Sequence, residues 1–136
     1  MNVNEYLIDE LKKEIENTTV VILAGGLGKR MNINIPKPLL KLREDYTLLD
    51  NEIDFYYRCG FKNFVFLLGY GAEEIISHLE KKGYKNRINY KVSVDPTTKN
   101  WGKGKAVKYA FENKVLKRER IMISYPDDVK LDKYLP

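Results

Sequence analysis

The sequence TVVILAGGLGKRM, residues 19–31, decides the fold of this 136-residue chain, because an apolar run leads directly into a glycine-rich loop. Residues 19–23 are β-branched or leucine, and they predict a buried strand. Gly25, Gly26 and Gly28 let backbone N–H groups turn toward an anion at close range. A strand that ends in such a loop predicts a phosphate-binding turn.

Cationic side chains follow the glycines. Arg30 offers a planar fork of donors that suits phosphate oxygens, and Lys37 lies between Pro36 and Pro38, whose backbones are restricted. A Walker phosphate loop has Ser or Thr after its lysine, whereas Arg30 follows Lys29 here. The pattern therefore indicates a nucleoside triphosphate site of another kind.

Strand and helix patterns alternate beyond this loop. We expect helices over residues 48–58, 72–82 and about 105–113, and strands over 63–68, 88–94 and 120–124. This order is typical of an α/β fold with a Rossmann-like, mostly parallel sheet and helices on both faces.

An amphipathic helix is predicted before the first strand, over residues 4–16. Its apolar side chains recur every four residues, at Val3, Leu7, Leu11 and Ile15. We therefore divide the chain into an additional N-terminal helix, residues 1–18, and one nucleotide-binding α/β domain, residues 19–136. The helix must bury its stripe on the domain or on another chain, so we expect a homo-oligomer.

Two motifs, LAGGLGKRM at 23–31 and PKPLL at 36–40, resemble the signature of the sugar-phosphate nucleotidyltransferases, or NDP-sugar pyrophosphorylases. The resemblance covers residues 19–136. It implies transfer of a nucleoside monophosphate from a triphosphate to a sugar 1-phosphate, with release of pyrophosphate. It also implies a fold of the nucleotide-diphospho-sugar transferase type, truncated after the metal-binding strand, so that this chain alone would be an incomplete enzyme.

The resemblance assigns roles to individual residues. Arg30 would be catalytic by stabilising the departing pyrophosphate, and Lys37 by contacting the α-phosphate and the incoming phosphate. A second glycine loop beginning at Trp101 resembles the one that receives base and ribose in this family. Across the two loops, nucleotide binding is assigned to Leu23, Ala24, Gly25, Gly26, Gly28, Lys29, Gly102 and Lys103. Lys103 stands where the family has threonine.

A metal site is predicted after the last strand. The sequence IMISYPDDV, residues 121–129, is an apolar strand that ends in paired carboxylates. The resemblance assigns the ligand of the nucleotide's Mg²⁺ to Asp128, with Asp127 where glycine is usual. Mg²⁺ takes one or two carboxylates together with phosphate oxygens and water, so one aspartate can suffice.

Composition leaves other interpretations open. The net charge of +5 is compatible with an anionic ligand, but the lysines are spread out and do not indicate a dedicated nucleic-acid surface. The single cysteine, Cys59, and the lack of a membrane-length apolar run favour a cytoplasmic protein. His78 is predicted to lie on the surface. The alternatives are a non-catalytic or regulatory nucleotide-binding module, and a cytidylyl- or guanylyltransferase for a non-sugar phosphate acceptor.

Overall fold

A computed structural model describes residues 2–24, 35–95, 108, 110, 112 and 120–124. Most of the predicted site residues lie outside these ranges, namely Gly25, Gly26, Gly28, Lys29, Arg30, Gly102, Lys103 and Asp128, and so does the neighbouring Asp127. Leu23, Ala24 and Lys37 lie inside them, as do the strands that lead to the predicted loops.

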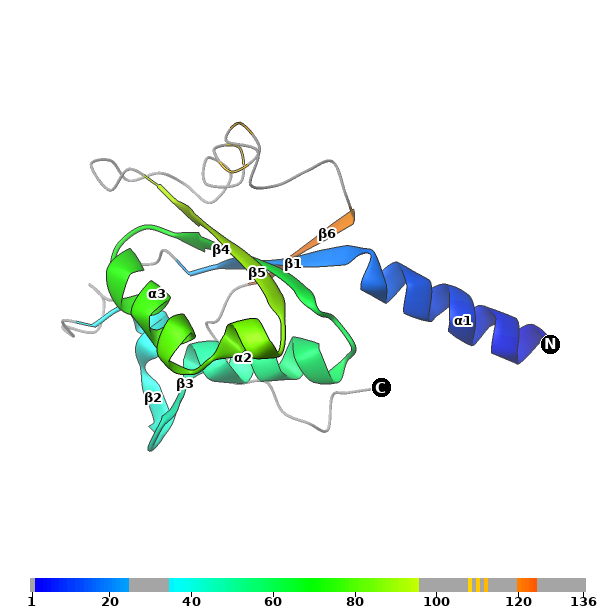
Figure 1. Cartoon of the computed structure of the whole chain (residues 1–136), viewed down its shortest axis with the longest axis horizontal. Coiled ribbons are helices and arrows are strands. Elements are labelled where there is room, and N and C mark those ends of the chain that lie inside the picture. The colour runs from blue at the N-terminus through cyan, green and yellow to red at the C-terminus, as the bar shows by residue number, and fades with distance from the viewer. Residues whose placement is uncertain are drawn as a thin grey trace.

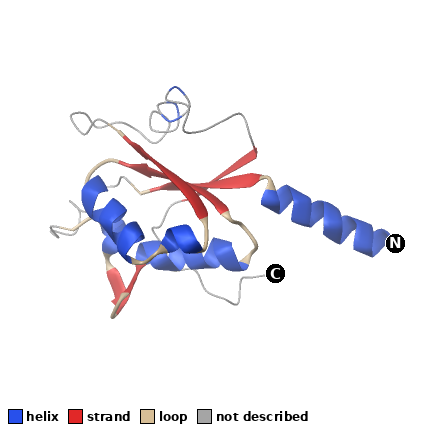
Figure 2. Ribbon diagram, viewed as in Figure 1, coloured by secondary structure: helices blue, strands red, loops and turns tan. Residues whose placement is uncertain are grey.

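The described residues form helices and strands in alternation (Figures 1 and 2). In chain order they are α1 (Val3–Glu16), β1 (Thr18–Leu23), η2 (Lys37–Leu39), β2 (Lys41–Arg43), β3 (Tyr46–Thr47), α2 (Leu48–Arg58), β4 (Asn63–Leu68), α3 (Ala72–Lys81), η3 (Tyr84–Asn86), β5 (Asn89–Val94) and β6 (Arg120–Ser124).

The main sheet is parallel and has the strand order β5-β4-β1-β6. β1 lies inside this sheet, because it pairs with β4 on one side and with β6 on the other. Its interior residues are almost all apolar and buried, as expected for a strand that is covered on both faces. The parallel α/β fold predicted from the sequence is confirmed.

Apolar side chains pack on both faces of the sheet. On one face α2 and α3 pack their apolar side chains against alternate strand residues, including Val20, Ile22, Phe64 and Phe66. On the other face Val21, Val65 and Leu67 pack with Ala110, which lies in a helical segment as predicted. The two-residue alternation of each strand therefore fills two separate cores.

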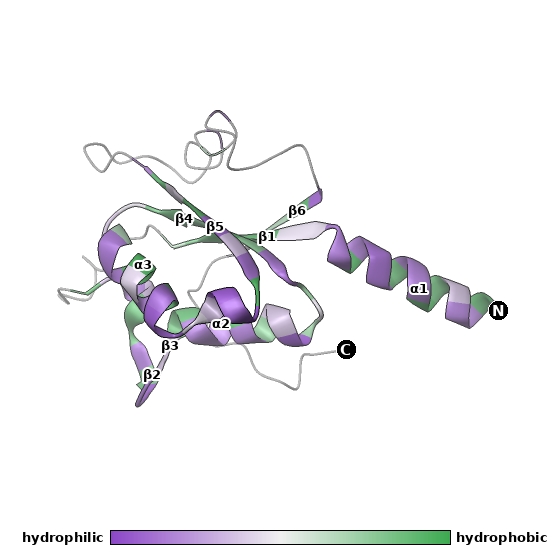
Figure 3. Ribbon diagram, viewed as in Figure 1, coloured by the Kyte–Doolittle hydropathy of each residue, from purple (hydrophilic) through white to green (hydrophobic). Residues whose placement is uncertain are grey.

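Helix α1 projects away from the sheet and contributes no buried residue (Figure 1). Among the described residues, contacts with the sheet are made by its C-terminal end: Thr18 Oγ1 donates to the carbonyl of Glu14 at 2.6 Å, Asn63 Nδ2 donates to the carbonyl of Glu16 at 2.9 Å, and Arg120 forms an ion pair with the Glu14 carboxylate at 2.9 Å. Green apolar and purple polar residues alternate along the helix in Figure 3. Val3, Leu7 and Leu11 of its apolar stripe are thus exposed, whereas Ile15, at the end near the sheet, is half-buried.

The segment between the glycine loop and α2 contains structure that the sequence did not predict. The 3₁₀ turn η2 is followed by a short antiparallel hairpin, β2–β3. The hairpin ends at Thr47, which caps α2 in a reciprocal capping box with Asp50.

None of the helices in the part of the chain that the structure describes is long and apolar enough to cross a membrane.

Candidate functional site

The carboxyl ends of β1 and β6 define the candidate site. The chain runs from β1 to β4 and β5 on one side and then returns to β6 on the other side of β1. The order of the sheet therefore reverses between β1 and β6, and ligands of open α/β sheets bind at such a switch point, beyond the carboxyl ends of the strands. In sequence, the glycine loop follows β1 and the paired aspartates follow β6.

The last residues of β1 fix where the glycine loop begins. Leu23 packs on the face of the sheet that contains Ala110, and Ala24 is fully buried in the opposite core. The backbone N–H of Ala24 donates to the carbonyl of Leu67 at 2.9 Å, although β1 has ended at Leu23. Ala24 therefore anchors the start of the loop on β4.

Lys37 begins the η2 turn between two buried prolines. The N–H of Leu39 donates to the carbonyl of Pro36 at 2.9 Å, and that of Leu40 donates to the carbonyl of Lys37 at 3.0 Å. Lys37 itself is half-buried. Because both neighbours are packed and the turn is hydrogen-bonded, the backbone from which the Lys37 side chain extends is held in one position.

A buried polar network joins α2 to the end of β6. Glu52 is 0 % exposed, and its Oε1 accepts a hydrogen bond from Ser124 Oγ. The hydroxyls of Tyr56 and Ser124 are 2.8 Å apart. Ser124 is the last residue of β6, so this network fixes the point from which the chain continues toward Asp127 and Asp128. Sequence reasoning missed Glu52, although an acid next to Ile53 on the core face of a predicted helix was a signal.

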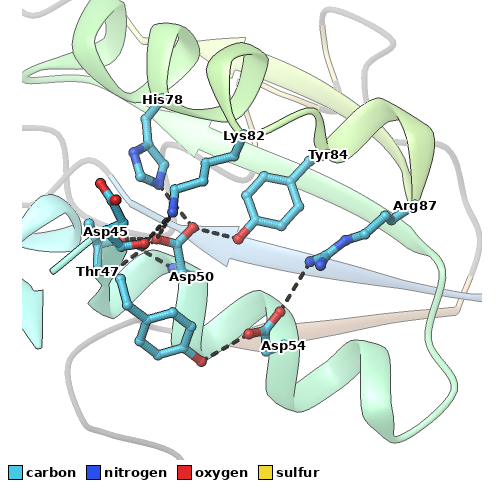
Figure 4. Close-up of polar contacts among 9 residues, drawn as sticks. Asp45, Thr47, Asp50, Asp54, His78, Lys82, Tyr84 and Arg87 are labelled. Atoms are coloured by element: carbon cyan, nitrogen blue, oxygen red, sulfur yellow. Dashed lines mark hydrogen bonds and ion pairs between the residues drawn. The ribbon is translucent and has the colours of Figure 1, made fainter. Parts of the chain in front are cut away.

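A second network surrounds Asp50 at the N-terminus of α2 (Figure 4). Asp50 Oδ2 accepts hydrogen bonds from the N–H and Oγ1 of Thr47, at 2.9 and 3.0 Å. Its Oδ1 lies 2.9 Å from Nε2 of His78 and accepts from the Tyr84 hydroxyl at 2.5 Å. Lys82 Nζ lies 3.9 Å from Oδ2. One carboxylate thus connects α2 to α3 and η3.

These contacts change the acidity of the groups involved. Burial alone would raise the pKa of Asp50, but the hydrogen bonds from His78, Tyr84 and the Thr47 backbone lower it to about 2. Burial, followed by the contact with the Asp50 carboxylate, raises the pKa of Tyr84. Asp50 therefore stays ionised under ordinary conditions, and the Tyr84 hydroxyl stays protonated and donates to it.

The prediction that His78 lies on the surface is wrong. Its side chain is 17 % exposed and contacts Asp50, whose side chain is 2 % exposed. The helix pattern placed His78 among charged residues, but Asp50 lies 28 positions earlier and the sequence did not indicate their contact. The network is a structural connection between helices, and no predicted site residue belongs to it.

The metal prediction depends on residues outside the described ranges. Within those ranges, no group of three or more His, Cys, Asp or Glu side chains is arranged to hold a metal ion. Ser124 pairs with Ile22 of β1, so the strand that precedes the paired aspartates ends beside the strand that precedes the glycine loop. A carboxylate pair at this position fits the ligand chemistry of Mg²⁺ bound to a triphosphate.

Asp95 follows β5 at the same edge of the sheet. Its N–H donates to the carbonyl of Leu68 at 2.8 Å, and burial raises the pKa of its carboxyl group. Oδ1 is buried and has no hydrogen-bond partner among the described residues. An acidic residue thus follows β5 at the edge of the sheet where, in sequence, the glycine loop follows β1 and the paired aspartates follow β6.

The described strands form an open parallel α/β sheet, and in sequence a glycine-rich segment and an acidic pair follow two neighbouring strands of it. The nucleotidyl transferase family matches residues 19–135, and the chain belongs to this family. No curated protein sequence matches the chain significantly.

Solved structures with this fold include HddC from Yersinia pseudotuberculosis complexed with GMP-PN, at 26 % identity and a TM-score of 0.64, covering 80 % of this chain and 47 % of that one. UTP-bound UGPase from Acinetobacter baumannii has 17 % identity and a TM-score of 0.64, covering 85 % and 47 %. UDP-glucose pyrophosphorylase complexed with UDP-glucose has 15 % identity and a TM-score of 0.67, covering 82 % and 46 %. The chain thus spans less than half the length of each of these neighbours.

Proposed function

We propose that the chain binds a nucleoside triphosphate with Mg²⁺ and forms the nucleotide-binding part of an enzyme that transfers a nucleoside monophosphate to a sugar 1-phosphate. Pyrophosphate is the second product. The family match supports the reaction type. The sugar is proposed from the motif resemblance and from the names of the structural neighbours, one of which is UDP-glucose pyrophosphorylase.

The observation that carries the proposal is the pairing of β1 with β6 at the switch point of the sheet. The two sequence segments with phosphate and metal chemistry, residues 25–30 and 127–128, follow these two strands. A triphosphate at this edge of the sheet is then within reach of backbone N–H groups from one side and a carboxylate from the other.

Each residue has a proposed role in an in-line attack on the α-phosphorus. Gly25, Gly26 and Gly28 supply backbone donors to the phosphates, and Arg30 stabilises the negative charge of the departing pyrophosphate. Lys37 contacts the α-phosphate and orients the incoming sugar phosphate. The reaction needs positioning and charge neutralisation, and no covalent intermediate on the protein.

We propose further contacts with the metal ion and with the nucleoside. Asp128 would hold Mg²⁺, which when bound supplies charge neutralisation at the phosphate oxygens. Gly102 and Lys103 would lie along the nucleoside. Leu23 and Ala24 set the position of the glycine loop from the end of β1.

The half-buried cysteine, Cys59, is compatible with a reducing cytoplasm.

Calorimetric titration tests this proposal directly. We expect one of ATP, GTP, CTP, UTP and dTTP to bind in the presence of Mg²⁺ and to be preferred over the others. GTP and UTP come first, because the neighbours named above contain GMP-PN and UTP. Pyrophosphate release with a sugar 1-phosphate would establish transfer. If none of the triphosphates binds, the proposal is overturned.

A nucleotide-binding module without transferase activity is the second candidate. The observations behind it are two departures from the family pattern, Lys103 where the family has threonine and Asp127 where glycine is usual. Selective triphosphate binding without pyrophosphate release from any sugar 1-phosphate would favour this candidate. Release with a polyol phosphate or choline phosphate instead would identify a transferase of another acceptor class.

We also propose that α1 mediates self-association. Val3, Leu7 and Leu11 are 73 %, 57 % and 58 % exposed, although they form one apolar stripe. Successive members of the stripe are four residues apart, so they stay on the same side of the helix. Two copies that pair along this stripe bury it against itself, which gives each exposed apolar side chain an apolar partner.

A further inference from the structure

Gly71 is in direct contact with the proline that precedes Lys37. Gly71 ends the turn between β4 and α3 and has a φ of 72°, a left-handed conformation that favours glycine. A Cβ atom built on Gly71 would lie 2.1 Å from Cγ of Pro36 and 3.0 Å from its Cβ. The Pro36 ring therefore occupies the space where any other residue at position 71 would place its side chain.

The other two described glycines with positive φ do not have such a neighbour. A Cβ on Gly83, whose φ is 68°, would come no closer than 3.5 Å to another residue, at the side chain of Asn86. A Cβ on Gly60 would lie 3.4 Å from Ile15. Backbone conformation alone explains these two glycines. At Gly71 the conformation and the proline contact both require glycine.

The contact between Gly71 and Pro36 affects the position of Lys37, the next residue in the chain. Pro36 is buried, its carbonyl accepts the 2.9 Å hydrogen bond from Leu39, and it is bonded to the first residue of η2. A methyl group on residue 71 would force the ring away and would shift the whole turn, because ring and turn are one rigid unit.

We infer that Gly71 is a positioning residue for the phosphate-binding lysine: the Gly69-Tyr70-Gly71 turn forms the seat for Pro36 and thereby places Lys37 at the phosphates. This inference rests on the role of Lys37 in the proposed function. It assigns a purpose to the Gly69-Tyr70-Gly71 turn, which is far from the glycine loop in sequence, and it connects the end of β4 to the proposed site beyond β1.

A double-mutant cycle tests the inference in the full chain. The probes are GTP, UTP and inorganic tripolyphosphate, each with Mg²⁺, because tripolyphosphate has no base and reports only phosphate binding. We expect Lys37→Ala to weaken binding by about tenfold or more, as for the loss of a charged hydrogen bond. Gly71→Ala should cause a loss of similar size, and combining it with Lys37→Ala should cause no further loss.

Two further variants separate positioning from general damage. Gly83→Ala has the same backbone strain without the proline contact, so it should bind the probes like the parent. Pro36→Ala removes the Cγ atom that the new methyl group would meet, so adding it to Gly71→Ala should restore part of the lost affinity. If Gly71→Ala unfolds the chain, Pro36→Ala alone takes its place, and its own loss should vanish in the Lys37→Ala background.

The outcomes are distinct. If Gly71→Ala weakens binding equally with and without Lys37, or if it binds like the parent while Lys37→Ala does not, the inference is overturned and the proposed function stands. If Lys37→Ala itself binds all three probes like the parent, the proposed role of Lys37 fails, and the inference fails with it.

Discussion

Ile22 of β1 pairs with Ser124 of β6, and each lies within one residue of the carboxyl end of its strand. Residues 24–119 separate the two strands in sequence, yet the strands end side by side. In sequence, the glycine loop with Arg30 comes directly after β1, and the acidic pair with Asp128 comes directly after β6. The register between β1 and β6 therefore places side by side the two strand ends from which the proposed phosphate-binding and metal-binding segments continue.

Replacing Arg30 should weaken triphosphate binding. Arg30→Ala removes a planar fork of donors, and we expect a loss of about 1.5 to 3 kcal/mol in binding free energy, as for a charged hydrogen bond. Calorimetry with the preferred triphosphate measures it. Lys13→Ala is the matched control, because it removes one positive charge from an exposed position on α1. Equal affinities of Arg30→Ala and the parent would refute the assignment.

Replacing Asp128 should abolish the effect of Mg²⁺. Asp128→Asn preserves the size of the side chain but removes the charge that the ion needs, so Mg²⁺ should no longer enhance nucleotide binding. Titrations with and without Mg²⁺ measure the difference, and circular dichroism checks the fold. Asp127→Asn is the control. If Asp127→Asn eliminates the enhancement and Asp128→Asn does not, the ligand is the preceding aspartate.

Much of the fold was predictable because the periodicity of single segments determined it. The predicted bounds of α2 and β4 agree with the structure, since α2 begins after the capping residue Thr47 and ends just before Gly60. The β2–β3 hairpin was not predicted, because its first strand is exposed and has no alternating apolar pattern. Local sequence contains little information about such a segment.

The polar networks were not predictable in the same way. Tyr84 and Asp50 are 34 positions apart, and Ser124 and Glu52 are 72 apart. Each contact depends on how two elements that are distant in sequence pack against each other, which no local pattern specifies. The motif residues, by contrast, could be proposed from sequence because consecutive positions carry their chemistry.

Removing the Tyr56 hydroxyl should lower stability modestly. The Tyr56 and Ser124 hydroxyls are 2.8 Å apart in a partly buried site, so we expect Tyr56→Phe to cost about 1 kcal/mol of unfolding free energy. Urea denaturation measures this loss. Tyr57→Phe, at the next position and 36 % exposed, is the matched control and should stay within about 0.5 kcal/mol of the parent. Equal effects of the two variants would contradict the prediction.

The Asp50 network should make stability depend on pH on the acidic side. The pKa of Asp50 is lowered from 3.8 to about 2, so its stabilising effect is complete above pH 4 and is lost as the pH falls through about 2. Each pKa unit corresponds to about 1.4 kcal/mol, which gives a stabilisation of about 2 kcal/mol. Asp50→Asn should be less stable than the parent by roughly this amount at pH 6, and the difference should shrink toward pH 2.

Asp54→Asn provides the control for this pH dependence. Asp54 lies on the same helix and contacts Arg87 at 3.1 Å and the Tyr46 hydroxyl at 3.0 Å, but its side chain is 25 % exposed, against 2 % for Asp50, so water screens its charge more. We expect a change below about 1 kcal/mol at pH 6. Urea denaturation between pH 2 and pH 6 measures the free energies of unfolding of the parent, Asp50→Asn and Asp54→Asn and so tests this pH dependence. A difference between Asp50→Asn and the parent that is constant over this range would contradict the assigned pKa.

Shortening the apolar stripe of α1 should dissociate the chain into monomers. Leu7 and Leu11 are more than half exposed and lie on the same side of the helix, so each copy gains by burying them against another. Combining Leu7→Ala with Leu11→Ala keeps helix propensity high while removing most of this apolar area. Sedimentation velocity should then give one species of 15.9 kDa, whereas the parent forms a dimer in the same buffer. Asp9→Ala, on the opposite side of the helix, should leave the parent's association unchanged. A parent chain that sediments as a monomer at high micromolar concentration would show that α1 does not pair with itself.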